Sequence, residues 1–360
     1  MELDVPPAPH PGLLAARAIR AARPGPGAEA LRRAYLDVLK LCLCDLGGTT
    51  TGSVGLGEGG TVASRELAGD QLRLRAAGMD CPLRGLTMVG LNRLDDLQAC
   101  VESVVDDRVP GDLVEAGVWR GGASMLMRAT LDALGDEGRT VVAADSFQGF
   151  PERDAEDRDS DAAPWSSMHY LGVPLEEVRA SFARFGLQAG VRFVPGFFQE
   201  TLPGLAGGRW ALVRLDGDTY DATRLALDCL YPGLGVGGHL VVDDYAVVDD
   251  CRRAVDDFRA EHGIAEPLHE VDWASVRWRR ERPQPAPPRP GRPDGGAARR
   301  PPPRAVPRPA VARVPSLEEV ALTQEVAALR ARLAAAEGEL ARVRAAPLAW
   351  LARRLRGRRS

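Results

Sequence analysis

From about residue 61 to residue 280, the chain alternates between short apolar runs of strand length and longer amphipathic segments with helical spacing. The apolar runs, which we predict to be strands, cover residues 112–116, 140–144, 191–195, 211–215 and 239–242. The predicted helices cover residues 91–107, 122–134, 175–186, 219–230 and 250–262. Strands that alternate with helices form a parallel sheet whose faces the helices cover. We therefore predict an α/β fold with a mostly parallel, doubly wound sheet.

The segment before this region has a different pattern. Residues 1–30 are rich in Pro, Gly, Ala and Arg and are predicted to be a disordered leader. Residues 31–46 place apolar side chains at helical spacing, and residues 47–60 are rich in Gly and Thr, which is typical of a flexible loop. We assign residues 31–86 to a helical N-terminal extension with a loop, and residues 87–280 to the main domain.

The C-terminal part divides into three segments. Residues 281–315 contain 12 Pro and 8 Arg, which predicts an extended linker. Residues 316–346 repeat apolar side chains at spacings of 4 and 3, from Leu322 to Val343, which predicts a coiled-coil helix, although a single helix packed on the domain would show the same pattern. Residues 347–360 form a basic amphipathic tail that could contact an acidic membrane surface or an acidic partner, or simply be solvated.

The formal net charge of −4 hides an uneven distribution. Residues 281–360 hold 17 Arg against 7 acidic residues, so the rest of the chain is strongly acidic. An acidic domain repels a phosphate backbone, and we therefore expect no nucleic-acid partner. No apolar run is long enough to cross a membrane, the first residues lack the pattern of a signal peptide, and the six Cys show no paired spacing. These features predict a cytoplasmic protein without a zinc site or a disulfide framework.

An apolar strand followed by glycines marks the first candidate site. The sequence LVEAGVWRGG at residues 113–122 places Glu115 and Gly117 at the end of a predicted strand. Glycines let the backbone pass close to a ligand, and an acidic side chain can accept a hydrogen bond from an ammonium or hydroxyl group. A dinucleotide fingerprint would need a glycine where Trp119 stands, and this side chain obstructs a pyrophosphate. The spacing instead resembles the first motif of class I S-adenosylmethionine-dependent methyltransferases, although an ordinary glycine turn would look similar.

A second predicted strand ends in an acid, Asp145, about 30 residues later. In a doubly wound nucleoside site, an acid at this place binds the ribose hydroxyls. The alternative is an Asp that caps a turn. The order and spacing of the two strands favour the ribose role.

Two further apolar strands run into clustered carboxylates, namely Asp216, Asp218, Asp243 and Asp244. Neighbouring parallel strands would bring these acids to one edge of the sheet, where they repel one another unless a cation compensates them. Oxygen ligands without His or Cys favour Mg²⁺, Mn²⁺ or Ca²⁺. The alternative is helix N-capping by Asp218 and Asp244. Both interpretations stay open for Asp218, whereas metal binding is the prediction for Asp216, Asp243 and Asp244.

A divalent cation beside a methyl donor has a specific use. It lowers the pKa of a bound hydroxyl and fixes its position, so that a carboxylate or a His can take the proton. Vicinal hydroxyls can chelate such a cation. The acceptor is therefore predicted to carry a diol, in a sugar or in a catechol.

The chain resembles the macrocin O-methyltransferase family, which is known for sugar methylation in macrolides. The matching stretches include YLDVLK at 35–40, TMVGL at 87–91, RLDDL at 93–97, residues 109–122, ADSF at 144–147 and VPLEEV at 173–178. They continue with PGFF at 195–198, LDGDTY at 215–220, VDDY at 242–245, DW at 272–273 and WRR at 278–280. The resemblance implies a class I, Rossmann-like methyltransferase that uses S-adenosylmethionine and Mg²⁺ and methylates a sugar hydroxyl of a natural product or glycan.

The same resemblance implies which residues bind the methionine part, the ribose and the adenine of the donor, and which cover it. Glu115 and Gly117 would contact the methionine part, Asp145 the ribose, and Ser146 and Phe147 the adenine. Thr87 and Met88 would cover the donor. The metal would be held by Asp216, Asp243 and Asp244, and Asp216 would also accept the hydroxyl proton as the catalytic residue.

Two other functions stay open from the sequence. A catechol-type O-methyltransferase would present the same metal ligands, and a methyltransferase-like scaffold without activity could act through the coiled coil. The expected partners are a small-molecule or glycan hydroxyl acceptor and further copies of the chain, in a homo-oligomer formed through the coiled coil or the N-terminal helix.

Overall fold

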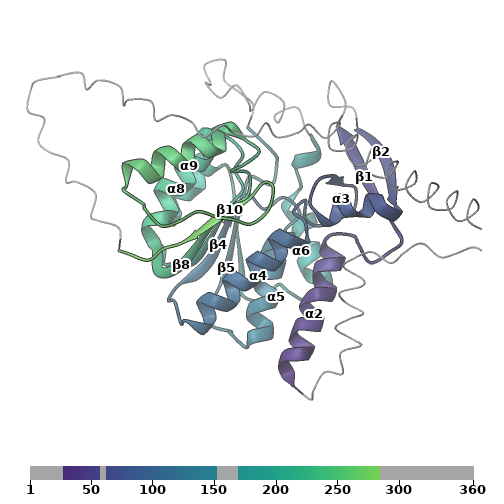
Figure 1. Ribbon diagram of the computed structural model, residues 1–360, viewed down its shortest axis with the longest axis horizontal. Helices are drawn as coiled ribbons and strands as arrows, with labels where there is room; N and C mark the ends of the chain where they lie inside the picture. Colours follow the sequence, from purple (N-terminus) through teal and green to yellow (C-terminus); the bar gives the residue numbers. More distant parts are fainter. Residues whose placement is uncertain (1–26, 57–61, 152–168, 284–360) are drawn as a thin grey trace, which may run out of the picture. The chain divides into compact units, whose positions relative to one another are not determined.

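The computed structural model describes residues 27–56, 62–151 and 169–283 (Figure 1). Most of the predicted leader, nearly all of the linker, the coiled-coil helix and the basic tail lie outside the described residues. The N-terminal extension and the main domain can therefore be compared with the prediction.

A seven-stranded sheet with the order β6-β5-β4-β7-β8-β10-β9 forms the centre of the main domain. The strands are β4 (Asp112–Ala116), β5 (Val141–Asp145), β6 (Val191–Pro195), β7 (Trp210–Leu215), β8 (Leu234–Val242), β9 (His269–Glu270) and β10 (Val276–Arg279). The strands from β6 to β8 pair in parallel, while β10 pairs antiparallel with both β8 and β9. The predicted mostly parallel, doubly wound sheet is confirmed.

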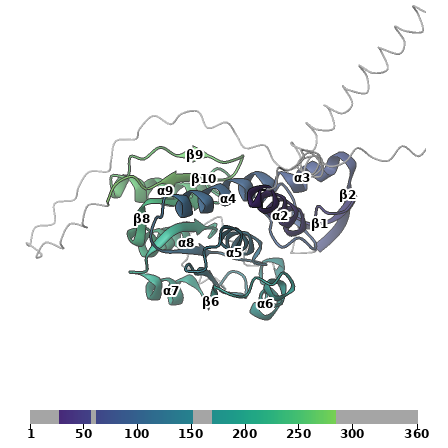
Figure 2. The same ribbon diagram turned by 90° about the horizontal axis from the view of Figure 1, so that it is seen from below.

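Helices cover both faces of this sheet (Figures 1 and 2). They are α4 (Leu91–Asp106), α5 (Gly122–Leu134), α6 (Leu175–Arg184), the short α7 (Phe198–Thr201), α8 (Tyr220–Leu230) and α9 (Asp249–Glu261). Alternate residues of β4 pack on opposite faces of the sheet. Leu113 packs with α4 and α5, while Val114 packs with α8 and α9. Burial on both faces explains why the parallel strands read as continuous apolar runs in the sequence.

The N-terminal extension contains more regular structure than the sequence predicts. Helix α2 (Ala28–Leu43) packs against α5, as its apolar stripe indicates. The predicted loop at residues 47–60 is wrong, because β1 (Thr50–Leu56) pairs there with β2 (Val62–Ala68) and β3 (Cys81–Pro82) in a small antiparallel sheet. The helix α3 (Leu72–Ala76) follows β2 after a short 3₁₀ turn.

Buried polar contacts explain why the apolar pattern did not reveal this sheet. Arg75 of α3 is 1% exposed and donates to Thr51 Oγ1 at 2.9 Å and to the carbonyl oxygen of Gly52 at 2.8 Å. The same guanidinium pairs with both carboxylate oxygens of Asp80, at 2.6 and 2.7 Å. The small sheet is thus attached through a buried ion pair as well as through Leu67 of β2, which packs in the apolar core.

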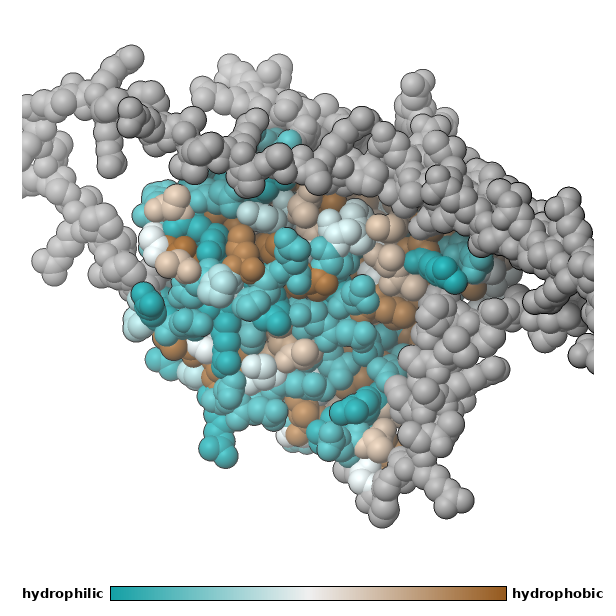
Figure 3. Space-filling view, in the orientation of Figure 1, coloured by the Kyte–Doolittle hydropathy of each residue, from teal (hydrophilic) through white to brown (hydrophobic). Residues whose placement is uncertain are grey.

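The strand order places a topological switch point at β4, whose neighbours are β5 and β7. Ligands of open α/β sheets bind beyond the carboxyl ends of the strands at such a point. Residues just after β4, β5, β7 and β8 therefore face one shared edge, and these are the segments singled out from the sequence. The face shown in Figure 3 is mainly hydrophilic with small apolar patches. None of the helices in the described part of the chain is long and apolar enough to cross a membrane.

Candidate active site

The turn after β4 brings the backbone of Gly117 directly against the end of β7. Gly117 has a φ of +91°, and a Cβ built on it would lie 1.8 Å from the carbonyl oxygen of Asp216. The N–H of Asp216 in turn donates to the carbonyl oxygen of Ala116 at 2.9 Å. Glycine is therefore required for the two strand ends to meet, and the backbone of the turn stays accessible to a ligand.

Asp145, at the end of β5, fixes the conformation of this turn. Its Oδ2 accepts the backbone N–H groups of Val118 and Trp119 at 2.6 and 3.1 Å, and its Oδ1 accepts the N–H of Phe147 at 2.7 Å. Trp119 has a φ of +47°, which is uncommon for a bulky residue and is held by these bonds. Asp145 thus has the turn-capping role considered from the sequence. Oδ2 already accepts two bonds, whereas Oδ1 can accept a further one, so the ribose contact stays a prediction.

Glu115 lies in the last part of β4, just before the turn, and is buried. It is 1% exposed, its Oε1 accepts from Arg214 at 2.6 Å, and its Oε2 accepts from the hydroxyl of Ser124 in α5. Burial raises the pKa of Glu115 to about 7, against the opposing effect of Arg214. Both oxygens are directed at protein partners, and the contact of Glu115 with the donor methionine stays a prediction.

Three carboxylates converge at the carboxyl ends of β7 and β8. Ligand oxygens of Asp216, Asp218 and Asp244 lie within 4.8 Å of one another. Burial, followed by the neighbouring carboxylates, raises the pKa of Asp218 to about 8 and the pKa of Asp244 well above its ordinary value. The neighbouring carboxylates contribute to both raised values, and a cation at this place would relieve that repulsion.

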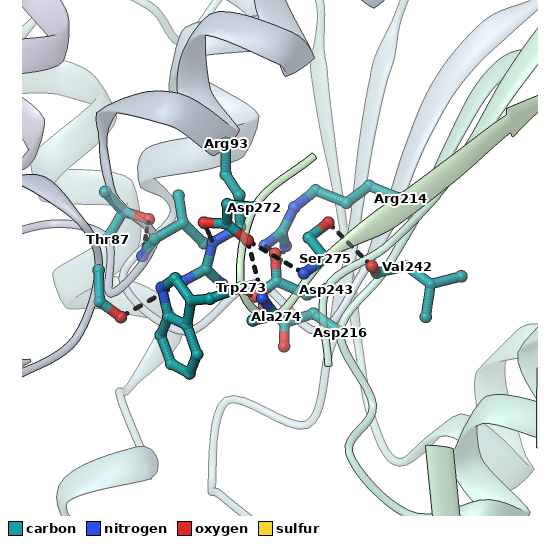
Figure 4. Close-up of polar contacts among 12 residues, drawn as sticks. Thr87, Arg93, Arg214, Asp216, Val242, Asp243, Asp272, Trp273, Ala274 and Ser275 are labelled. Atoms are coloured by element: carbon teal, nitrogen blue, oxygen red, sulfur yellow. Dashed lines mark hydrogen bonds and ion pairs between the residues drawn. The ribbon is translucent and has the colours of Figure 1, made fainter. Parts of the chain in front are cut away.

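Asp243 is held apart from these three oxygens by two arginines (Figure 4). Its Oδ2 accepts from Arg93 of α4, and its Oδ1 accepts from Arg214 of β7, each at 2.6 Å. Burial alone would raise the pKa of Asp243, but the guanidinium groups of Arg214 and Arg93 outweigh it and lower the pKa. Of the three predicted metal ligands, the structure therefore brings together Asp216 and Asp244 and adds Asp218 to them.

Helix capping does not account for Asp218 or Asp244. The N-cap of α8 is Thr219, whose hydroxyl accepts the N–H of Ala222 at 3.3 Å, and the N-cap of α9 is Val248. Asp218 has a φ of +57°, which turns the chain between β7 and α8. The capping alternative considered from the sequence is wrong for both residues.

The remaining predicted donor residues line the same end of the sheet but are largely buried. Thr87 is 5% exposed, and its hydroxyl accepts the N–H of Val89 at 3.3 Å. The hydroxyl of Ser146 donates to the carbonyl oxygen of Gly149 at 2.6 Å, while Phe147 packs edge-on against Phe193 with ring centroids 6.3 Å apart. Met88 is half-buried next to Thr87. Their contacts with the donor stay predictions.

A model of the macrocin-O-methyltransferase (TylF) family matches residues 59–280, which is more than half of the chain. The chain belongs to the macrocin-O-methyltransferase family. The extent of the match agrees with the predicted resemblance, and it includes the glycine turn and both carboxylate-bearing strand ends.

Relatives and a solved structure agree with this membership. A protein of Streptomyces olivaceus, 8-demethyl-8-(2,3-dimethoxy-alpha-L-rhamnosyl)-tetracenomycin-C 4'-O-methyltransferase, is 53% identical over 208 residues, which cover 57% of this chain and 79% of the relative. Mycinamicin III 3''-O-methyltransferase of Micromonospora griseorubida is 44% identical over 211 residues, 57% of this chain and 83% of the relative. The structure of the O-methyltransferase NovP aligns with a TM-score of 0.62 and 39% identity, covering 70% of this chain and all of NovP.

Membership in the macrocin-O-methyltransferase family identifies the chain as an O-methyltransferase. The class I methyltransferase fold, shared with NovP, implies S-adenosylmethionine as the methyl donor. The predicted family, fold and enzyme class are thus confirmed.

Sequence reasoning missed the two arginines that organise the site. Arg93 and Arg214 are 8% and 3% exposed, and each contacts more than one carboxylate. Arg214 offered a signal, because a charged side chain in the middle of an apolar, fully covered strand needs a buried partner. Arg93 lies within the RLDDL stretch, but its partner Asp272 is 179 residues away in sequence. Such a long-range contact leaves no local pattern.

Proposed function

We propose that this member of the macrocin-O-methyltransferase family transfers the methyl group of S-adenosylmethionine to a sugar hydroxyl, with Mg²⁺ held at the carboxyl ends of β7 and β8. The observation that carries the proposal is the convergence of Asp216, Asp218 and Asp244 next to the turn at Gly117. The name of the Streptomyces olivaceus relative specifies a rhamnosyl group, which supports a sugar as the acceptor.

The residues present fit a hard divalent cation. Oδ2 of Asp244 is buried and has no hydrogen-bond partner among the described residues, and an unpaired buried oxygen of this kind is costly. Three carboxylate oxygens without His or Cys match the preference of Mg²⁺ for oxygen ligands. We assign Asp216, Asp218 and Asp244 as the ligands. Asp243, predicted as a ligand from the sequence, instead orients Arg214 through its 2.6 Å contact.

The donor is proposed to lie along the turn at residues 117–121, at the switch point of the sheet. There the backbone of Gly117 allows close approach, and Asp145 keeps the turn in shape while its Oδ1 could accept a ribose hydroxyl. Ser146 and Phe147 would border the adenine. The donor sulfonium would then lie near the carboxylates that follow β7.

Asp216 is proposed to be the catalytic base. When bound, Mg²⁺ supplies the lowering of the hydroxyl pKa that makes an alkyl hydroxyl reactive near neutral pH. Asp216 accepts the hydroxyl proton, the hydroxyl oxygen attacks the methyl carbon, and the bond between that carbon and sulfur breaks with its electron pair left on sulfur. Arg214 holds Asp216 Oδ2 at 2.9 Å, which keeps the carboxylate oriented.

The test is mass spectrometry of deoxysugar glycosides with free vicinal hydroxyls, incubated with the chain, S-adenosylmethionine and either Mg²⁺ or a chelator. The expected result is a gain of one methyl that the chelator abolishes. Asp216→Asn and Asp244→Asn should each lower the rate by about 100-fold or more. Asp228→Asn, which changes an exposed carboxylate paired with Arg224, is the matched control and should retain activity. Methylation of a catechol but of no glycoside would contradict the sugar acceptor, and full activity in chelator would contradict the metal.

A further inference from the structure

The buried guanidinium of Arg214 contacts carboxylates that come from three adjacent strands. Its NH1 donates to Glu115 Oε1 of β4 at 2.6 Å and to Asp216 Oδ2 after β7 at 2.9 Å. Its NH2 donates to Asp243 Oδ1 after β8 at 2.6 Å. Arg214 pairs in register with Glu115 on the neighbouring strand, so the contact follows from the sheet itself.

Further hydrogen bonds link these carboxylates to the helix after the donor turn on one side and to Arg93 on the other. On the donor side, Glu115 accepts from Ser124, which lies in the first turn of α5 directly after the glycine turn. On the other side, Asp243 also binds Arg93, whose Nε donates to Asp272 Oδ2 at 3.0 Å (Figure 4). Buried, charge-assisted bonds therefore connect the first turn of α5 to the carboxylate cluster.

The chemistry of guanidinium makes this connection stiff. A planar guanidinium has five donors in fixed directions, so it can hold several carboxylates at once, whereas an ammonium is a point charge with rotating donors. Arg214 is 3% exposed, and water does not replace these bonds when one partner shifts. A displacement of Glu115 by events at the turn would therefore be felt at Asp216.

We propose that Arg214 is a positioning residue that links occupancy of the donor turn to occupancy of the carboxylate cluster. This inference rests on the proposed function, because it needs a donor at the turn and a cation on Asp216. Binding at either site fixes the orientation that Arg214 imposes on the other. By thermodynamic linkage, each ligand must then strengthen the binding of the other by the same factor.

Simple electrostatics predicts a different result from positioning. A positive charge beside metal ligands weakens cation binding, so replacing Arg214 by a neutral residue should tighten binding if charge is its whole effect. Arg214→Lys keeps the charge but loses the fork that reaches Glu115, Asp216 and Asp243 together. A loss of linkage in this variant therefore reports geometry and not charge.

The experiment measures the affinity of Mn²⁺, by the loss of its free electron paramagnetic resonance signal, with and without S-adenosylhomocysteine. In the wild-type chain, the nucleoside should tighten Mn²⁺ binding by at least about five-fold. In Arg214→Lys the factor should fall close to one, while Arg279→Lys, which alters an exposed pair with Asp107, should keep the wild-type factor. Circular dichroism confirms that each variant is folded.

Glu115→Ala provides a second route if Arg214→Lys does not fold. This change removes the carboxylate that joins Arg214 to Ser124, and the linkage factor should again fall. An unchanged factor in either folded variant would overturn the role of Arg214 and leave the proposed metal site intact. A wild-type chain that binds Mn²⁺ without any effect of the nucleoside would also overturn it. A wild-type chain that binds no Mn²⁺ would overturn the proposed metal site as well.

Discussion

Gly117 illustrates how a single residue sets the geometry of the site. Its φ of +91° and the 1.8 Å approach of a built Cβ to the carbonyl oxygen of Asp216 impose two separate costs on any larger residue. Gly135, at the C-cap of α5, has a φ of +74°, but a Cβ built there meets nothing within 4 Å. The two glycines therefore separate the cost of left-handed backbone from the cost of a steric clash.

We expect Gly135→Ala to lower the free energy of unfolding by about 1 kcal/mol, the ordinary cost of a left-handed alanine. Gly117→Ala should cost about 1–3 kcal/mol more, because β4 and β7 must separate to admit the methyl group. Urea denaturation followed by fluorescence measures both. Equal losses in the two variants would mean that the strand ends move apart without strain, and Gly117 would then have no special role.

One buried side chain contributes strongly to the attachment of the small N-terminal sheet. Arg75 joins β1 to α3 and to Asp80 through buried bonds. We expect Arg75→Leu to leave Asp80 as a buried, unpaired charge and to detach the sheet, with a loss on the order of 3–5 kcal/mol in local stability. Hydrogen exchange should show faster exchange across β1 and β2 with little change in β4 and β7.

Arg73→Leu is the matched control for this prediction. Arg73 lies on the same helix, two residues away, but its side chain is 69% exposed and pairs with Asp70, which is 89% exposed. Exposed pairs of this kind contribute little to stability, so exchange in β1 should not change. If Arg75→Leu left the exchange of β1 equally unchanged, the sheet would be held by its backbone pairing and by the packing of Leu67 instead.

The elements of the main domain could be predicted well because burial and periodicity coincide in them. Strands β4 and β6 and helix α5 match their predicted residues, since each is apolar on the face or faces that it buries. β10 and β9 were not predicted, because an antiparallel strand rich in Arg, such as β10, has no apolar run. β1 was predicted as a loop because two of its three buried positions are Thr51 and Ser53, which leaves Val54 as a single apolar signal.

The location of the candidate site could be predicted from the sequence, but the partner of each carboxylate could not. The order of strands and acids placed Asp145, Asp216 and Asp244 at one edge, as observed. Which acid faces a cation and which faces an arginine depends on Arg93 of α4, whose contact with Asp243 spans 150 residues of sequence. Side-chain pairings over such separations follow from the folded sheet and not from the spacing of residues along the chain.

At the scale of the whole molecule, the described contacts of the main domain end near Arg280. Its guanidinium donates to the carbonyl oxygen of Tyr231 at 3.1 Å and to that of Leu234, which ties the end of β10 to the start of β8. We expect a chain that ends after Pro283 to retain methyl transfer, because the site residues lie before this point. Light scattering should show a smaller oligomer if the predicted coiled coil associates. An unchanged oligomer would instead favour association through α2, which exposes Leu31, Tyr35 and Val38.

The dependence of stability on pH should report the carboxylate cluster directly. The pKa of Asp218 is raised from 3.8 to about 8, and that of Glu115 from 4.5 to about 7, in both cases chiefly by burial. The folded chain therefore binds these protons more tightly than the unfolded chain, and the stability they contribute is lost as the pH rises from about 4 to 8.

In chelator, the midpoint of thermal unfolding should fall by on the order of 5 °C between pH 5.5 and pH 8. Millimolar Mg²⁺ should reduce this fall, because the cation replaces the lost protons. Asp218→Asn should also reduce the fall, because it removes a titrating carboxyl, whereas the control Asp228→Asn should not. Equal midpoints at both pH values in chelator would show that these carboxylates are already compensated without a cation.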